Sequence, residues 1–168
     1  MSADPQGRDL LALAVEIAAE AAVIVAKYAA ERTYAIETKS SPTDLVTEAD
    51  RESEALIVRA ILAARPNDGL LGEEGASREG ASGIRWVIDP IDGTTNFVYG
   101  IPAYSVSIGV ERDGQVIAGV VHDVALKEAR LARVAAQGGD AFTFLRQDFA
   151  DYTGLLAALE PHAFDRVV

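Results

Sequence analysis

Apolar residues recur at steps of three and four over the first third of the chain, and this spacing predicts two amphipathic helices. The first is predicted over residues 8–32, where the repeat runs through Leu10, Leu13, Ile17, Ala21, Ile24 and Tyr28. The second is predicted to begin near Thr47, because TEAD nearly matches a capping box, with aspartate in place of Glu or Gln. It should stop before Pro66, since a proline disfavours helical backbone angles in the preceding residue.

Beyond residue 68 the apolar pattern changes to alternation, which predicts strands joined by tight turns. Short strands are expected in GLLGEE (69–74) and IRWVID (84–89). The clearest hairpin is YSVSIGVERDGQVIAGVVHD (104–123), because Asp113-Gly114 is a strong turn signal between two alternating segments. EARLARVA (128–135) can continue the sheet. Helices followed by strands predict the α+β fold class, with the helices layered on a mainly antiparallel sheet.

Length and composition indicate the number of domains, the cellular compartment and the kinds of molecule that the protein can bind. The 168 residues suit one domain with its own core, and we expect residues 1–168 to form a single domain. Lys and Arg number 15 against 26 Asp and Glu, a net charge of -11, which argues against nucleic-acid binding. The sequence has no cysteine, which suits a reducing compartment. The N-terminus lacks a signal-peptide pattern, and the most apolar run (18–30) contains Glu20 and Lys27. We therefore expect a cytoplasmic protein that does not bind membranes.

The stretch WVIDPIDGTTNF (86–97) carries the most specific chemistry. Apolar residues lead into a strand expected to end at Asp89, where Pro90 forces a turn that can return Asp92 to the same side. Two carboxylates held close together either share a proton or hold a cation. Oxygen ligands without cysteine favour Mg²⁺, with Mn²⁺ as the alternative, over Zn²⁺. Gly93 allows close backbone approach, and GTTNF can open a short helix whose N–H groups would receive a phosphate.

Each acidic motif also has an ordinary structural explanation. An Asp-Pro turn with both acids solvated accounts for DPIDG taken alone. Glu73 and Glu74 in LLGEEG can be solvated loop charges, and only one of them should point into a site, because neighbouring strand residues face opposite sides. Asp44 and Asp50 can serve as helix caps or first-turn acids. His122 is expected to be a structural or surface histidine. The aromatic residues Trp86, Phe97, Tyr99 and Tyr104 are expected to be core or dimer contacts and not a substrate platform.

Three segments taken together favour a functional site over these structural explanations. KSSPTDLVTEAD (39–50), GEEG (72–75) and WVIDPIDGTTNFVYGIPAYSVSIGV (86–110), in this order and spacing, resemble the inositol monophosphatase family. That family comprises Mg²⁺-dependent, lithium-sensitive sugar phosphatases with a layered αβαβα fold. The resemblance covers residues 8–142, which match the N-terminal half of the family. It implies an enzyme that hydrolyses inositol monophosphate, or a related sugar or polyol phosphate, by direct attack of water.

The resemblance also implies a set of metal ligands. Glu73, Asp89 and the backbone carbonyl of Ile91 would hold a first Mg²⁺ (Mn²⁺ as the alternative). Asp89 and Asp92 would share a second ion, and Asp92 would border the substrate as well. Two cations bridged by one carboxylate can stabilise both the attacking and the leaving oxygen of an in-line displacement.

The catalytic roles implied by the resemblance fall on three side chains. Thr94, paired with Asp50, would orient and deprotonate the attacking water, assisted by a third and weaker ion near Glu73. Threonine alone is a poor base, so Asp50 must accept the proton through it or by a short relay. Gly93 and Thr94 would offer backbone N–H groups to the phosphate, and Lys39 would lie near the site.

The family pattern is incomplete in this sequence. Family members carry a Trp-Asp motif in their second half whose aspartate completes the second metal site. Trp86 is the single tryptophan here, and valine follows it. We therefore expect a shortened chain with an incomplete C-terminal layer, in which residues 143–168 match no clear part of the family and the second metal site is weak. Two hypotheses remain: an active phosphomonoesterase, which family resemblance makes a homodimer, or a weakly active or inactive domain that works by association.

Overall fold

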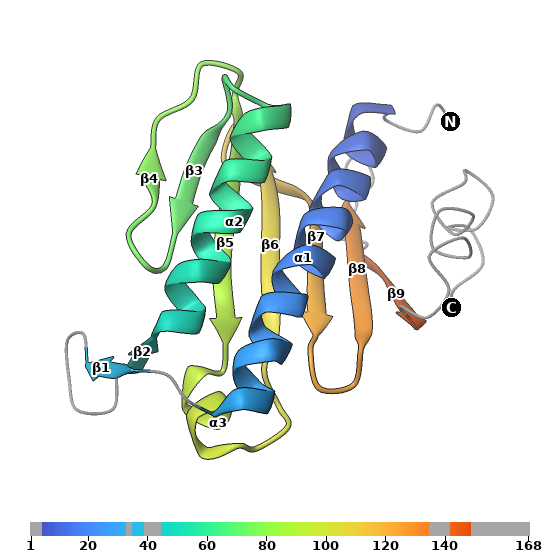
Figure 1. Ribbon diagram of the computed structural model, residues 1–168. Coiled ribbons are helices and arrows are strands. Elements are labelled where there is room, and N and C mark those ends of the chain that lie inside the picture. Colours follow the sequence, from blue (N-terminus) through green and yellow to red (C-terminus); the bar gives the residue numbers. More distant parts are fainter. Residues whose placement is uncertain (1–4, 33–34, 39–44, 135–141, 149–168) are drawn as a thin grey trace.

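Two long helices cover one face of a sheet (Figure 1). The computed structural model describes residues 5–32, 35–38, 45–134 and 142–148. The helices are α1 (Pro5–Glu31) and α2 (Glu48–Ala64), close to their predicted bounds. Neither of them, among the residues described, combines the length and apolar character needed to cross a membrane.

Within the described part of the chain, the sheet has seven strands in the order β4-β3-β5-β6-β7-β8-β9. All neighbouring strands are antiparallel except β3 and β5, which are parallel. The strands are β3 (Gly69–Gly72), β4 (Ser77–Arg78), β5 (Ile84–Asp92), β6 (Ser105–Arg112), β7 (Gln115–Asp123), β8 (Glu128–Val134) and β9 (Phe142–Asp148). Two further strands, β1 (Ile36–Thr38) and β2 (Leu45–Thr47), form a separate antiparallel pair, and α3 (Thr94–Tyr99) is a short helix after β5. The α+β class with helices on a mainly antiparallel sheet is confirmed.

Local sequence signals account for most element boundaries. Thr47 caps α2, and Thr47 and Asp50 exchange the reciprocal hydrogen bonds of a capping box, as predicted. The helix ends at Ala64, two residues before the proline. Asp113 and Gly114 both have positive φ in the turn between β6 and β7, as an Asp-Gly hairpin turn requires. The first short strand ends earlier than predicted, at Gly72. The strand β9 was not predicted, and the residues after Asp148 lie outside the described part.

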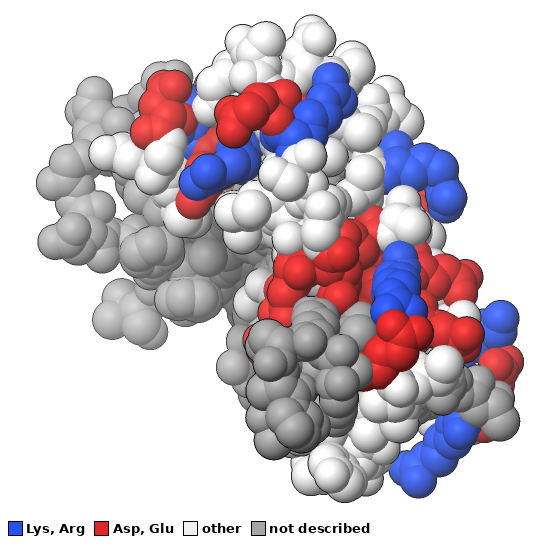
Figure 2. Space-filling view, turned by 90° about the vertical axis from the view of Figure 1, so that its left-hand side faces the viewer, with Lys and Arg blue, Asp and Glu red and all other residues white. Residues whose placement is uncertain are grey.

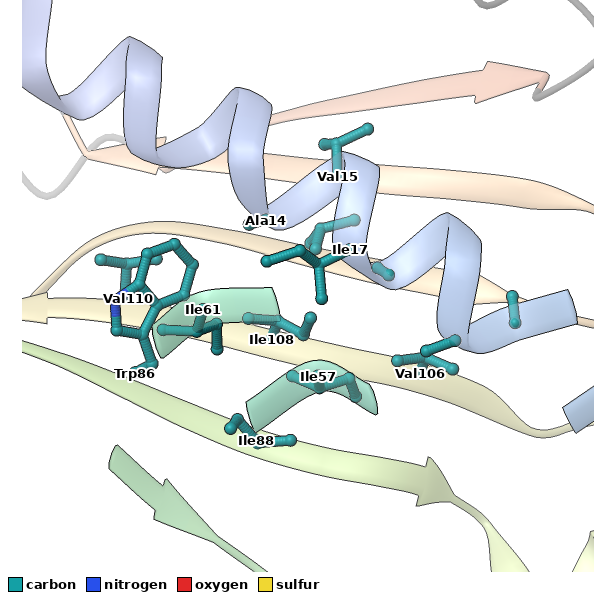
Figure 3. Close-up of a cluster of buried hydrophobic side chains, with 14 of the residues drawn as sticks. Ala14, Val15, Ile17, Ile57, Ile61, Trp86, Ile88, Val106, Ile108 and Val110 are labelled. Carbon is teal, nitrogen blue, oxygen red and sulfur yellow. The ribbon is translucent and has the colours of Figure 1, made fainter. Parts of the chain in front are cut away.

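The core lies between the helices and the sheet (Figure 3). Ile57 and Ile61 of α2 are fully buried against apolar side chains of β5 and β6. Every second residue of these strands points to the face of the sheet that the helices cover. On α1 the buried positions include small alanines, which allow the helix to lie close to the sheet. Trp86 is fully buried and Phe97 nearly so, as expected for core residues, whereas Tyr99 is 72% exposed and lies outside the core.

His122 lies on the helix-facing side of β7, opposite Val106 of β6, and is 5% exposed. Burial lowers the pKa of His122 to about 4, against a small opposing effect of Asp123. Because the folded pKa lies below the unfolded value of about 6.5, the unfolded chain binds more protons between these pH values. Stability contributed by neutral His122 is therefore complete above pH 6.5 and is lost as the pH falls towards 4.

We expect acidification from pH 7 to pH 4 to remove about 3 kcal/mol of unfolding free energy through His122. The measurement is urea unfolding at several pH values, for the parent chain and for His122→Gln, which cannot titrate. The variant should lose correspondingly less stability over this range. Parallel losses in the two proteins would contradict a buried neutral histidine.

Candidate active site

The candidate site is built around an irregularity near the end of β5. Asp89 pairs with Ser107 and Asp92 with Ser105, so two residues of β5 lie opposite one residue of β6. This is a β-bulge. The two residues that form it, Pro90 and Ile91, are both buried. Asp89 and Asp92 therefore come to the same side of the strand, although they are three positions apart.

The prediction that the strand ends at Asp89 was wrong, since β5 continues to Asp92. The physical reason is that a bulge removes a ladder hydrogen bond, so a proline without an N–H can remain inside the strand. The turn expected at Pro90 is replaced by this bulge. Asp89 and Asp92 nevertheless lie on the same side of the strand, as the turn would have placed them.

Glu73 follows β3 directly, and β3 lies beside β5 in parallel. The backbone N–H of Glu73 donates to the carbonyl of Ile88 at 3.0 Å, which places Glu73 next to Asp89. Burial, followed by hydrogen bonding and charge from Glu73 and charge from Asp92, raises the pKa of Asp89 to about 8. The structure thus places Glu73 beside Asp89, and it places Asp92 near enough for its charge to act on Asp89.

The donor set fits a hard divalent cation. The buried Oδ1 of Asp89 has no hydrogen-bond partner, although a buried carboxylate oxygen normally has one. Burial is the main cause of the raised pKa of Asp89, and Glu73 and Asp92 add to it; a bound cation would offset these effects by stabilising the carboxylate. Within the described residues, however, no three such side chains are gathered closely enough to hold a metal ion as they stand. Asp89 and its two acidic neighbours therefore provide suitable donors that would have to close around an ion.

Open space and acidic charge accompany these side chains. A hollow of about 420 Å³ is lined by Glu73 and Asp89, and one of about 280 Å³ by Asp92 and Gly93. Figure 2 shows Asp and Glu side chains gathered in a broad patch on the side of the molecule at the left of Figure 1. The acidic excess of the sequence is thus partly concentrated in one region.

Asp50, in the first turn of α2, lies next to Thr94, the first residue of α3. The side chain of Asp50 is fully buried, and its Oδ2 accepts hydrogen bonds from the backbone N–H (2.8 Å) and the hydroxyl (2.6 Å) of Thr47. Its Oδ1 lies 3.2 Å from the hydroxyl of Thr94, which also lies 2.9 Å from the carbonyl oxygen of Ile91. A hydroxyl has one proton, so Thr94 donates to one of these acceptors at a time. Burial raises the pKa of Asp50, and the hydrogen bonds from Thr47 and Thr94 oppose that rise.

Gly93 joins β5 to α3 and adopts a left-handed backbone conformation, which favours glycine. Its φ is +92°, and a Cβ at this position would lie 2.9 Å from the carbonyl oxygen of Ala103. The carbonyl of Gly93 accepts the hydrogen bond of Phe97 and so starts the helix. Gly93 therefore fixes where Thr94 stands relative to the bulge.

We expect Gly93→Ala to lower the unfolding free energy by about 2 kcal/mol or more, because strain at positive φ and a clash with backbone add together. The matched control is Gly114→Ala, which has a φ of +80° but no atom within 4 Å of the added Cβ. Urea unfolding of both variants separates the two effects. Equal losses would show that the contact with Ala103 contributes nothing.

Two contacts of the site were not predicted from the sequence. Ser53 donates its hydroxyl to the carbonyl of Pro90 at 3.4 Å, and Glu54 accepts hydrogen bonds from backbone N–H groups of the loop after β3. Their signal was available, since positions 50, 53 and 54 share one face of a helix. Lys39 and Asp44 fall outside the described residues.

Comparison with known proteins places these features in a family. The sequence profile described as "Inositol monophosphatase family" matches residues 7–148. An inositol-1-monophosphatase of Mycobacterium bovis is 43% identical over 149 residues, covering 80% of this chain and 50% of that protein. A histidinol-phosphatase of Chlorobaculum parvum is 42% identical over 132 residues, covering 79% and 49%. The solved structure of an IMPase of Thermotoga maritima superposes with a TM-score of 0.73 at 32% identity, covering 83% of this chain and 51% of that one. The chain thus spans about half the length of these relatives.

Proposed function

The chain belongs to the inositol monophosphatase family, and from this premise we propose that it acts as a metal-dependent phosphomonoesterase on inositol monophosphate or a related sugar or polyol phosphate. The bulge at Pro90 and Ile91 is the observation that carries the proposal. It turns Asp89 and Asp92 to one side of the strand, and Glu73 lies beside Asp89. Folding does not require acidic side chains at these positions. Inhibition by lithium, a homodimer and a cytoplasmic location stay predictions.

Four groups of this chain are suited to hold Mg²⁺ or Mn²⁺. They are the carboxylates of Glu73, Asp89 and Asp92 and the carbonyl of Ile91, which has a second lone pair besides the one that faces Thr94. A bound divalent cation would neutralise phosphate charge and make a bound water easier to deprotonate. Asp89, as the most crowded of the three acids, is the central ligand of the proposal.

Proton transfer is assigned to Thr94 and Asp50. When the hydroxyl of Thr94 donates to Oδ1 of Asp50, its oxygen lone pairs are free to accept a proton from water. Asp50 can then take the proton from Thr94, and burial, which raises the pKa of Asp50, favours this transfer. The capping box holds Oδ2 of Asp50 in place, so that only Oδ1 is directed at Thr94. The assignment of Gly93 and Thr94 N–H groups to the phosphate remains part of this proposal.

One structural observation favours the alternative of a domain that works by association. The sheet face turned away from α1 and α2 carries exposed apolar side chains at Leu71, Val116 and Val121. Leu71 and Val116 line the same hollow as Glu73 and Asp89. This face could pair with another polypeptide without any hydrolysis.

Phosphate release separates the two candidates. The chain is incubated with inositol 1-phosphate and with histidinol phosphate while Mg²⁺ is titrated against a chelated control. The proposed function predicts saturable, Mg²⁺-dependent release from at least one of them. A folded chain that binds Mg²⁺ but releases no phosphate from either would favour association over hydrolysis.

A further inference from the structure

One face of α2 contacts all three segments that build the candidate site. Asp50 bonds Thr94 at the start of α3, Ser53 bonds the bulge at Pro90, and Glu54 bonds the loop of residues 72–76. Positions 50, 53 and 54 share a face because a helix brings residues three and four apart together. The same helix therefore sets the relative positions of segments that are distant in sequence.

Glu54 is a buried carboxylate of α2 that accepts two hydrogen bonds from the loop of residues 72–76. Its side chain is buried, with 6% of the residue exposed. Oε2 accepts the backbone N–H of Glu74 at 2.9 Å, and Oε1 accepts that of Ala76 at 3.1 Å. A Cβ added at Gly72 would overlap Oε2, so the glycine leaves the space that the carboxylate occupies. A buried carboxylate that bonds two N–H groups of one short loop is suited to fixing the conformation of that loop.

Glu73 lies between the anchors of this loop. Its own N–H donates to the carbonyl of Ile88, one position before Asp89. The loop is closed by a bond from the N–H of Gly72 to the carbonyl of Ala76 at 2.6 Å, and Glu54 accepts the N–H groups of Glu74 and Ala76. The backbone of Glu73 is therefore fixed on the β5 side by Ile88 and on the α2 side by Glu54.

We propose that Glu54 is a positioning residue that fixes the loop of residues 72–76, keeps Glu73 beside Asp89, and thereby sets the affinity of the site for a divalent cation. The inference rests on the proposed function, because the cation is part of it. In this role Glu54 contacts neither cation nor substrate and acts through the backbone N–H groups of Glu74 and Ala76.

Glu54→Gln tests the role with little change in shape. The amide offers one acceptor oxygen, and its NH₂ group would face the second backbone N–H. We expect at least a tenfold loss of Mn²⁺ affinity, measured by calorimetry on the full chain, and faster hydrogen exchange at the amide of Glu74 or Ala76. Glu52→Gln is the matched control on the same helix: Glu52 is exposed and accepts a bond from Tyr28, which glutamine can still accept. The control should change neither quantity.

Gly72→Ala approaches the same contact from the other side. Its methyl group would displace the carboxylate of Glu54 from the loop, so it should also weaken Mn²⁺ binding. Because both changes remove one interaction, the double variant should lose no more affinity than the weaker-binding single variant. Circular dichroism checks the fold, and Gly72→Ala carries the test if Glu54→Gln does not fold.

The outcomes separate this inference from the function on which it rests. Unchanged Mn²⁺ affinity in a folded Glu54→Gln chain overturns the positioning role while leaving the proposed function intact. A parent chain that binds no Mn²⁺ overturns both. Weakened Mn²⁺ binding in Glu54→Gln supports the positioning role even if the parent chain releases no phosphate, a result that would overturn the proposed activity alone.

Discussion

Asp89→Asn is expected to reduce Mg²⁺-dependent phosphate release by about a thousandfold or more while the chain stays folded. Burial and the acidic neighbours raise the pKa of Asp89, and its buried Oδ1 lacks a hydrogen-bond partner in the protein. Replacing it with a neutral amide removes the charge with which Asp89 would hold a divalent cation. A loss of several kcal/mol in transition-state stabilisation corresponds to this range, since each tenfold change in rate is about 1.4 kcal/mol.

The folded state should tolerate this change, because neutralising one of three crowded acids relieves repulsion. Asp113→Asn is the matched control, since Asp113 lies in the hairpin turn, where Asn-Gly is equally favoured. Initial rates of phosphate release at saturating Mg²⁺, with urea unfolding in parallel, make the comparison. An Asp89→Asn chain as active as the Asp113→Asn control would remove Asp89 from the metal site.

The largest effect on stability is expected away from the site, at Asp68. This side chain is 1% exposed and accepts hydrogen bonds from Arg65 (2.9 Å), Ser82 (2.7 Å) and the ring N–H of Trp86 (2.9 Å). Asp68→Asn would place an NH₂ group against these donors and leave Arg65 without its partner. We expect a loss of about 3 kcal/mol in unfolding free energy, measured as a lower urea midpoint.

The pKa of Asp68 gives this prediction a pH dependence. Burial raises the pKa of Asp68, but the hydrogen bonds from Arg65, Ser82 and Trp86 outweigh burial and lower it. The stability that Asp68 contributes is therefore present above its unfolded pKa and is lost as the pH falls through the lower, folded value.

Glu111→Gln is the control for the Asp68 variant. Glu111 pairs with Arg85, whose side chain is 50% exposed, so the loss should stay below about 1 kcal/mol. Equal losses in the Asp68 and Glu111 variants would contradict the role assigned to the buried carboxylate.

Local signals were sufficient to predict much of the fold. The three-and-four spacing of apolar residues predicted α1 and α2, and TEAD predicted the capping box because its partners are three residues apart. Asp113-Gly114 predicted the hairpin between β6 and β7 for the same reason. Such signals act within one element or turn, and a single sequence contains them completely.

Features that depend on several elements were predicted less well. Pro90 is compatible with a turn or with a bulge, and pairing with β6, which a single sequence does not reveal, decides between them. The bond between Asp50 and Thr94 was expected from family resemblance, not from residue spacing. The contacts of Ser53 and Glu54 depend on the bulge and on the loop after β3, which are distant from α2 in sequence, so residue spacing alone did not predict them.

The central claim is that Glu73, Asp89 and Asp92 converge on a divalent cation. A crystal structure of the chain grown with Mn²⁺ tests it directly, because anomalous scattering locates the ion independently of activity. We expect a peak about 2 Å from carboxylate oxygens of Asp89 and at least one of the other two acids. A map at full Mn²⁺ occupancy with no peak beside Asp89, or with its only peaks elsewhere, would contradict the account.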